Sequence, residues 1–167
     1  MPSKSGVFYL TGLGGELDAG LGSALQDLEV SYTGISYTGD FRNLGLCDQL
    51  DQIMTELSKF IDVGGQKLVA VSAGGYLIAK MLQREEYNLS KLDILLLSPG
   101  LPEYIPVRNK PRSLRILLGS EDRICSINEI EKLLSTISNS SFLIVNGAGH
   151  DLPHDIVRNE ILSLEGY

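Results

Sequence analysis

The sequence predicts an α/β fold, with one mainly parallel sheet of about six strands and helices on both of its faces. Short apolar runs alternate with amphipathic stretches along the chain, and this alternation favours right-handed crossovers between parallel strands. Some runs, such as 93–97, are apolar at nearly every position, which is typical of strands covered on both faces. Because 167 residues suit one domain and no linker or internal repeat is visible, we expect a single domain over residues 1–167.

The first half of the chain is expected to contribute three strands and three helices. The strands are predicted at 6–10, 31–37 and 67–71. The second of these is the least hydrophobic, so we expect it near an edge of the sheet. The helices are predicted from apolar residues at helical spacing: Leu17, Leu21, Leu25 and Leu28 in the first, the stretch 46–61 before Gly64 and Gly65 in the second, and Leu77, Ile78, Met81 and Leu82 in the third.

The second half repeats this alternation. Strands are predicted at 93–97, 114–118 and 142–145. Between the last two, Ser126 and Glu129 have the spacing of a capping box and predict the start of a helix. The amphipathic stretch at 155–164 predicts a final helix that completes the second layer.

The charge balance excludes several classes of partner. The chain has 14 Lys and Arg against 21 Asp and Glu, a net charge of −7, which argues against nucleic-acid binding and against strong attraction to anionic membranes. The two cysteines, Cys47 and Cys125, lie far apart and form no CxxC pair, so we expect both thiols to be small apolar fillers in a reducing, cytoplasmic protein. The N-terminal apolar run is too short for a signal peptide, and no stretch is long enough to span a bilayer.

Ser72 stands where the predicted strand 67–71 turns abruptly into a helix, and small residues surround this turn. They are Ala70, Ala73, Gly74 and Gly75. Small side chains let the strand and the helix pack closely, so the hydroxyl is expected to project above the end of the sheet, as in a nucleophile elbow. The alternative is a serine that only caps the helix.

Two other reactive side-chain types follow predicted strands. An acid, Glu121 or Asp122, follows the fifth strand, and His150 follows the last. Because ligands bind outside the carboxyl ends of the strands in such sheets, we expect a serine, an acid and a histidine on one rim. A purely structural histidine is the alternative for His150, but the joint placement of the three favours a catalytic base.

This combination of side chains suits nucleophilic catalysis. A serine hydroxyl needs a base to accept its proton, and histidine titrates near neutral pH. A carboxylate behind the imidazole fixes its tautomer and stabilises the imidazolium that forms. The developing oxyanion needs N–H donors. Candidates are the amide of Ala73, at the N-terminus of a helix, and the amide of Leu13, in the glycine-rich loop after the first strand.

Two other function classes compete with this interpretation. The stretch GLGGEL at 12–17 is similar to a dinucleotide fingerprint, with Asp40 as the ribose acid, but Leu17 occupies the third glycine position. A nucleotide-binding protein of this kind would leave Ser72 and His150 without a role. The second alternative is a module that binds a partner without catalysis, since fold does not fix function, and an intact triad counts against it.

The chain resembles a small α/β-hydrolase without a cap domain. The order Ser72, Asp122, His150 matches the order of nucleophile, acid and base in that superfamily, and it favours Asp122 over Glu121 as the acid. Four further segments resemble its motifs: TGLGG at 11–15 the oxyanion loop, GSED at 119–122 the acid loop, GAGH at 147–150 the histidine loop, and YTGDFRNLG at 37–45 the Asp-x-Arg-Gly-x-Gly segment.

The resemblance implies a serine hydrolase that cleaves a small carboxylic ester or thioester through an acyl-enzyme, with no cofactor and no metal. Three positions depart from the family pattern: Thr11 replaces a histidine, and Ala70 and Asn43 replace glycines. The segment 99–114, where larger members insert a lid, is short, so the resemblance implies an open site for short acyl groups. Residues Tyr104, Ile105 and Pro106 in this segment are candidates for a pocket wall.

Overall fold

The computed structural model describes residues 6–28, 32–103 and 106–164. Its strands are β1 (Val7–Leu13), β2 (Tyr32–Tyr37), β3 (Lys67–Val71), β4 (Asp93–Leu97), β5 (Ser113–Gly119) and β6 (Ser140–Val145). Its helices are α1 (Leu21–Gln26), α2 (Gly39–Asn43), α3 (Leu46–Asp62), α4 (Ala73–Leu82), α5 (Ile127–Leu134) and α6 (His154–Ser163). Within these ranges, no helix combines the length and the apolar character that a membrane span requires.

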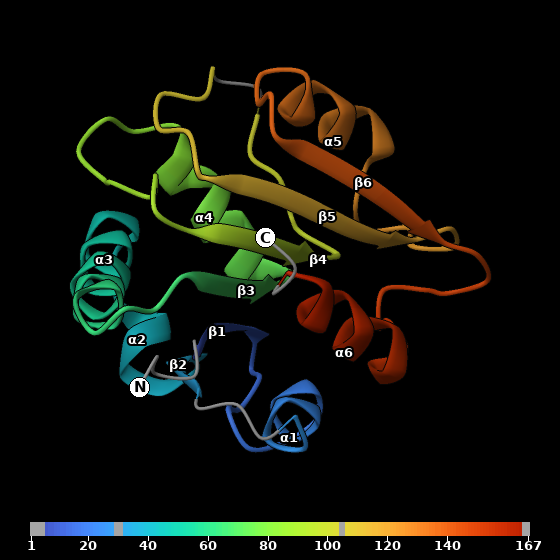
Figure 1. The fold of residues 1–167 in the computed structure, drawn as a ribbon, viewed down its shortest axis with the longest axis horizontal. Helices are drawn as coiled ribbons and strands as arrows, with labels where there is room; N and C mark the ends of the chain where they lie inside the picture. The colour runs from blue at the N-terminus through green and yellow to red at the C-terminus, as the bar shows by residue number, and fades with distance from the viewer. Residues whose placement is uncertain (1–5, 29–31, 104–105, 165–167) are drawn as a thin grey trace.

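The six strands form one sheet in the order β2-β1-β3-β4-β5-β6, and every neighbouring pair is parallel (Figure 1). The predicted six-stranded parallel sheet is therefore confirmed, and so is the edge position of β2. All six carboxyl ends consequently lie along one edge of the sheet, where the loops after the strands can meet.

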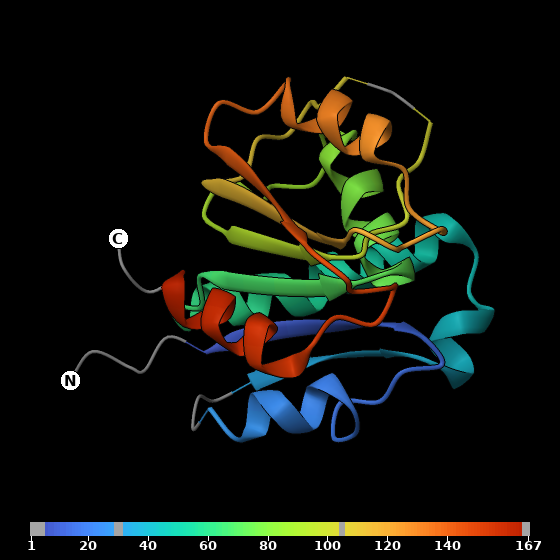
Figure 2. The ribbon, with the colours of Figure 1, turned by 90° about the vertical axis from the view of Figure 1, so that its right-hand side faces the viewer.

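Helices cover both faces of the sheet, as predicted, but unequally (Figure 2). The larger apolar cluster joins α3, α4 and α5 to one face, to which Phe8 and Leu10 contribute from β1. The smaller cluster joins α1 and α6 to the other face, which receives Val7 and Tyr9. This division follows from the strand geometry, because successive side chains of a strand point to opposite faces.

Some local predictions were wrong. Helix α1 is shorter than the leucine spacing indicates, because Gly20 adopts a φ of 57° and the helix begins only at Leu21. The five-residue helix α2 was not expected. The helix start predicted at Ser126 is confirmed, because Ser126 is the N-cap of α5, but its side chain makes no capping bond, and Glu129 pairs with Lys132 at 3.2 Å.

The two cysteines differ in their surroundings. Cys47 lies in the first turn of α3 and is exposed, so its prediction as a buried filler was wrong. The apolar face of that helix is formed by other residues, among them Leu50 and Ile53. Cys125 is half-buried, and its thiol donates to the carbonyl oxygen of Ser98 at 3.1 Å.

The connection from β4 to β5 contains no helix within 99–103 and 106–112. Its later part is tied to the body of the protein, because the N–H groups of Arg108 and Asn109 donate to the carbonyl of Leu82. This agrees with the expected absence of an inserted lid in the described part of the segment. Of the predicted pocket wall, Tyr104 and Ile105 lie outside the described residues.

Helix α4 packs against the sheet at very short range. A Cβ at Gly74 would lie 2.5 Å from the carbonyl oxygen of Thr11, and one at Gly75 would lie 2.8 Å from Cβ of Pro99. Only glycine fits at such distances. The chain must therefore pass from β3 into α4 at a single residue, Ser72, whose φ is 49°.

We expect Gly74→Ala to lower the free energy of unfolding by about 1–3 kcal/mol, because the added methyl group forces α4 away from β1. Denaturant unfolding followed by circular dichroism measures this change. The matched control is Gly149→Ala, where the added Cβ meets nothing within 4 Å, and it should cost less than about 0.5 kcal/mol. Equal losses in the two variants would contradict the packing argument.

Candidate active site

The structure brings Ser72, Asp122 and His150 together at the carboxyl edge of the sheet. Ser72 follows β3, Asp122 lies in the turn after β5, and His150 lies in the loop after β6. His150 joins the other two side chains: its Nδ1 lies 2.9 Å from Oδ2 of Asp122 and its Nε2 lies 2.9 Å from Oγ of Ser72. The three predicted side chains thus form one continuous hydrogen-bonded chain.

The Ser72 hydroxyl is directed at His150 and makes no capping bond to α4, so the alternative of a purely capping serine was wrong. The backbone on both sides of it is held firmly. Its N–H donates to the carbonyl of Leu97 at 2.9 Å, and its carbonyl accepts from the N–H groups of Tyr76 at 3.0 Å and Gly100 at 3.1 Å. These bonds keep the residue at its positive φ.

The Asp122 carboxylate is the buried partner in this arrangement, with a side chain that is 0% exposed. Burial alone would raise the pKa of this carboxyl group. The hydrogen bonds from His150 and from the N–H groups of Ile124 and Cys125 outweigh burial, so the pKa lies below its ordinary value. Glu121, the competing acid, points its side chain to solvent.

The ionised state of Asp122 determines the tautomer of His150. A carboxylate can only accept hydrogen bonds, so Nδ1 of the imidazole carries the proton that it donates to Asp122. In the neutral ring Nε2 is then an acceptor, and it faces the hydroxyl of Ser72. This arrangement lets His150 take a proton from Ser72.

Ser98, at the end of β4, anchors the histidine loop. Its Oγ donates to the carbonyl of His150 at 2.7 Å, across 52 residues of sequence. Ser98 was not among the predicted site residues. The available signal was its position after β4, the strand between β3 and β5, but the contact itself could not be read from local sequence.

The glycine-rich loop after β1 lies directly against the serine, since a Cβ at Gly12 would be 3.5 Å from Cβ of Ser72. Thr11 organises this loop. Its buried hydroxyl oxygen accepts a hydrogen bond from the N–H of Tyr37 at 2.7 Å. The same hydroxyl donates to the carbonyl oxygens of Gly12, at 3.0 Å, and Gly15, at 3.3 Å. A threonine thus supplies polar support where the resembling family has a histidine.

The two amides expected to bind the oxyanion belong to the residue that follows Ser72 and to the last residue of β1. Ala73 is the first residue of α4, and an N–H in the first turn of a helix has no acceptor within that helix. Leu13 ends β1, and its side chain is 57% exposed. Their assignment as oxyanion donors stays a prediction.

The ligand atoms of Asp122, Cys125 and His150 lie within 4.8 Å of one another, which raises the question of a metal site. The chemistry of the donors disfavours one. Burial, followed by the neighbouring Asp122 charge, raises the pKa of the Cys125 thiol to about 12, whereas metals bind the thiolate. Both ring nitrogens of His150 are already in hydrogen bonds, Nδ1 with Asp122 and Nε2 with Ser72.

The segment 37–45 is held by a residue outside it. Gln49 is buried, and its Nε2 lies 3.1 Å from the carbonyl of Leu44 and 3.3 Å from that of Phe41. Within the segment, the side chains of Asp40 and Arg42 are exposed. His154, the first residue of α6, is also exposed.

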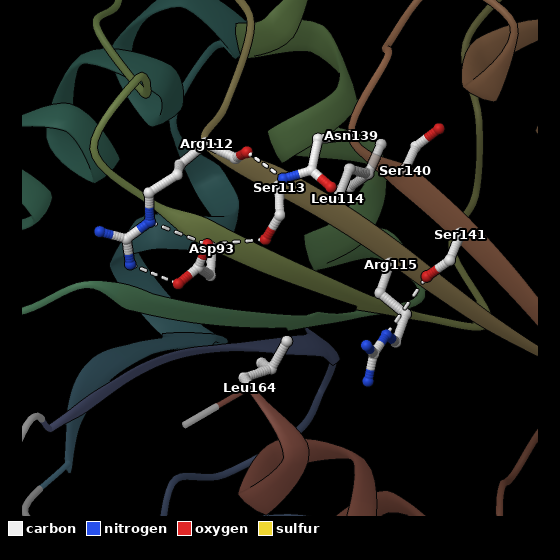
Figure 3. Close-up of a pocket in the computed structure, with 9 residues that line it drawn as sticks. All are labelled: Asp93, Arg112, Ser113, Leu114, Arg115, Asn139, Ser140, Ser141 and Leu164. Carbon is white, nitrogen blue, oxygen red and sulfur yellow. Dashed lines mark hydrogen bonds and ion pairs between the residues drawn. The ribbon is translucent and has the colours of Figure 1, made fainter. Parts of the chain in front are cut away.

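A cavity of about 290 Å³ lies at the opposite edge of the sheet, where β4 and β5 begin (Figure 3). Its arginines are already paired: Arg112 donates to Asp93, and Arg115 bonds Glu160 at 2.7 Å. Burial opposes ionisation of Asp93, but Arg112 and Ser113 hold the pKa of its carboxyl below the ordinary value. These groups form a structural ion-pair network far from Ser72.

No family model matches the chain, and no curated protein matches it. Solved structures similar to the chain are known. Est1E from Butyrivibrio proteoclasticus is 16% identical, with a TM-score of 0.69 over 98% of this chain and 88% of that one. The phospholipase/carboxylesterase from Dyadobacter fermentans is 15% identical, with a TM-score of 0.67 over 96% and 91%.

A Xanthomonas campestris protein, provisionally named as a hydrolase of the α/β superfamily, is 16% identical, with a TM-score of 0.69 over 96% of this chain and 99% of that one. At such identities, similarity establishes the fold alone. The sheet order, the serine turn and these three structures agree with one another. The chain has the α/β-hydrolase fold.

Proposed function

We propose that the protein is a serine hydrolase that cleaves a small carboxylic ester or thioester, with Ser72 as nucleophile, His150 as base and Asp122 as the acid behind it. The observation that carries this proposal is the hydrogen-bonded chain from Asp122 through His150 to Ser72, with both links at 2.9 Å. The similar structures include proteins named as hydrolases and as a phospholipase/carboxylesterase, which supports the same reaction class.

Acylation begins when His150 Nε2 takes the hydroxyl proton of Ser72 while Oγ attacks the carbonyl carbon. The imidazolium that forms is stabilised by the Asp122 carboxylate. When the tetrahedral intermediate collapses, the bond to the leaving oxygen or sulfur breaks, and Nε2–H returns the proton to that atom. Water then attacks the acyl carbon while His150 takes its proton; the bond from that carbon to Oγ of Ser72 breaks, Nε2–H returns the proton to Oγ, and the carboxylic acid is released.

The negative charge on the tetrahedral intermediate needs donors that are in position before reaction. We assign this role to the amides of Leu13 and Ala73. The dipole of α4 supports the second of these, because its N-terminus lies at Ser72. Thr11 supports the first by holding the glycine-rich loop. This reaction uses only side chains, backbone amides and water, so it requires no cofactor.

Ser72→Ala should lower kcat by about three decades or more while the protein stays folded, because the acyl-enzyme can no longer form. A fluorophosphonate probe should label the wild type at Ser72, as read by peptide mass spectrometry, and should not label the variant. Ser58→Ala, an exposed position on α3, is the control and should label like the wild type. Unchanged turnover in Ser72→Ala would overturn the proposal.

Asp122→Asn should lower kcat by about 10³–10⁴-fold, because the amide can donate to Nδ1 and so leaves the imidazole in the wrong tautomer. Glu121→Gln, one residue away and exposed, should change kcat less than about threefold. Both variants are compared by steady-state kinetics on the same ester. The reverse ranking would assign the acid to Glu121.

Thr11→Val keeps the shape of the side chain but removes the hydroxyl that holds the glycine-rich loop. We expect kcat to fall about ten- to a hundredfold with a smaller change in KM, which is less than the loss of an oxyanion donor itself. Thr11→Ser retains the hydroxyl and should recover most of the activity. If Thr11→Ser is as impaired as Thr11→Val, packing of the methyl group matters and the hydroxyl does not.

A further inference from the structure

A cavity of about 380 Å³ borders His150 on the face of the sheet that α1 and α6 cover. Its wall is mostly apolar. Leu21 contributes from the start of α1, Val71 and Leu97 from the ends of β3 and β4, and Val157 from α6. The cavity therefore lies directly beside the candidate triad, and its surface suits an apolar group.

The first residues of the two helices on this face, Leu21 of α1 and His154 of α6, line the cavity. Helix α1 has only six residues and begins at Leu21, after the turn at Gly20. Helix α6 begins at His154, well past the end of β6. Val71, which is partly buried, and Leu97, which is 2% exposed, line the cavity from the ends of β3 and β4. Asp151 and His154, both exposed, border it on the solvent side.

The size of the cavity is that of a ligand site. Pockets for small molecules commonly measure about 300–1,000 Å³, and a water molecule occupies about 30 Å³ of liquid. About 380 Å³ therefore holds roughly a dozen waters, or one organic group of moderate size. Its polar lining residues are Ser98, His150, Asp151 and His154, and the rest of the wall is apolar, so an apolar ligand would release the water along that wall at little cost.

We propose that this cavity binds the leaving group of the substrate, an apolar alcohol or thiol, and this assignment rests on the proposed function. In the collapse of the tetrahedral intermediate, Nε2–H of His150 gives its proton to the leaving oxygen or sulfur as the bond to the acyl carbon breaks. The leaving atom must therefore lie within hydrogen-bond reach of Nε2. The acyl carbon remains bonded to Oγ of Ser72.

The geometry separates the two halves of the substrate. His150 lines the cavity, whereas Ser72 is not among its lining residues. On this assignment the leaving group departs from His150 into the cavity, while the acyl group, bonded to Ser72, stays outside it. We therefore expect kcat/KM to depend on the chain length of the alcohol and to depend little on the chain length of the acyl group.

The test uses two ester series on the purified full-length protein. In the first, acetates of methanol, butanol, hexanol and benzyl alcohol vary the leaving group; in the second, methyl esters of acids with the same chain lengths vary the acyl group. Each methylene buried in the cavity should raise kcat/KM by about fourfold in the first series, until the cavity is full. The second series should stay nearly flat.

Two substitutions fill the cavity from opposite walls, Val157→Phe from α6 and Leu21→Trp from α1. Each should lower the ratio of kcat/KM for hexyl acetate over methyl acetate by at least about tenfold. The second variant is informative if the first does not fold, because Leu21 is only partly buried whereas Val157 is 1% exposed. Leu162→Phe, an exposed position on α6 outside the cavity, is the matched control and should keep the wild-type ratio.

A flat alcohol series, or ratios in both filled variants that equal the wild-type ratio, would overturn this assignment. So would a filled variant that changes the acyl series instead, since the cavity would then hold the acyl group. Fluorophosphonate labelling separates this failure from failure of the proposed function. Labelled Ser72 with unchanged ratios rejects only the cavity assignment, whereas absence of both labelling and ester hydrolysis rejects the two together.

Discussion

The close packing of α4 against β1 is the constraint on which the candidate site depends. A Cβ at Gly74 would collide with the carbonyl oxygens of Leu10 and Thr11, so the helix can approach the sheet only with glycine there. The chain then has one residue, Ser72, in which to leave β3 and enter α4. Its positive φ costs about 1–3 kcal/mol for a residue other than glycine. The hydrogen bonds on both sides of Ser72 offset that cost and fix where its hydroxyl points.

Strand β4 contributes no member of the triad, yet it ties the other parts together. It lies between β3 and β5, and Ser98 at its end contacts two loops. The hydroxyl of Ser98 donates to the carbonyl of His150, and its own carbonyl accepts from the thiol of Cys125. The acid loop and the histidine loop are thereby held to the strand beside the serine. These bonds between loops help to hold His150 at 2.9 Å from both Asp122 and Ser72.

The two faces of the sheet have different roles in this architecture. The helices α3, α4 and α5 cover the larger apolar cluster, which contains most of the largest fully buried side chains. The opposite face carries the smaller cluster and the helices α1 and α6. The cavity beside His150 lies on that side. Stability thus comes mainly from one face, and room for a ligand comes from the other.

The sequence by itself determined the order of the strands and helices and the side-chain types at the rim. Apolar runs and helical spacing are local signals, and the carboxyl ends of parallel strands share one edge. Only the tertiary structure showed that Asp122, and not its neighbour Glu121, contacts His150, that Ser98 bonds the histidine loop, and that α1 starts at Leu21. Adjacent residues in a turn point in different directions, and a bond between residues 52 positions apart leaves no local signal, because it depends on how distant loops pack.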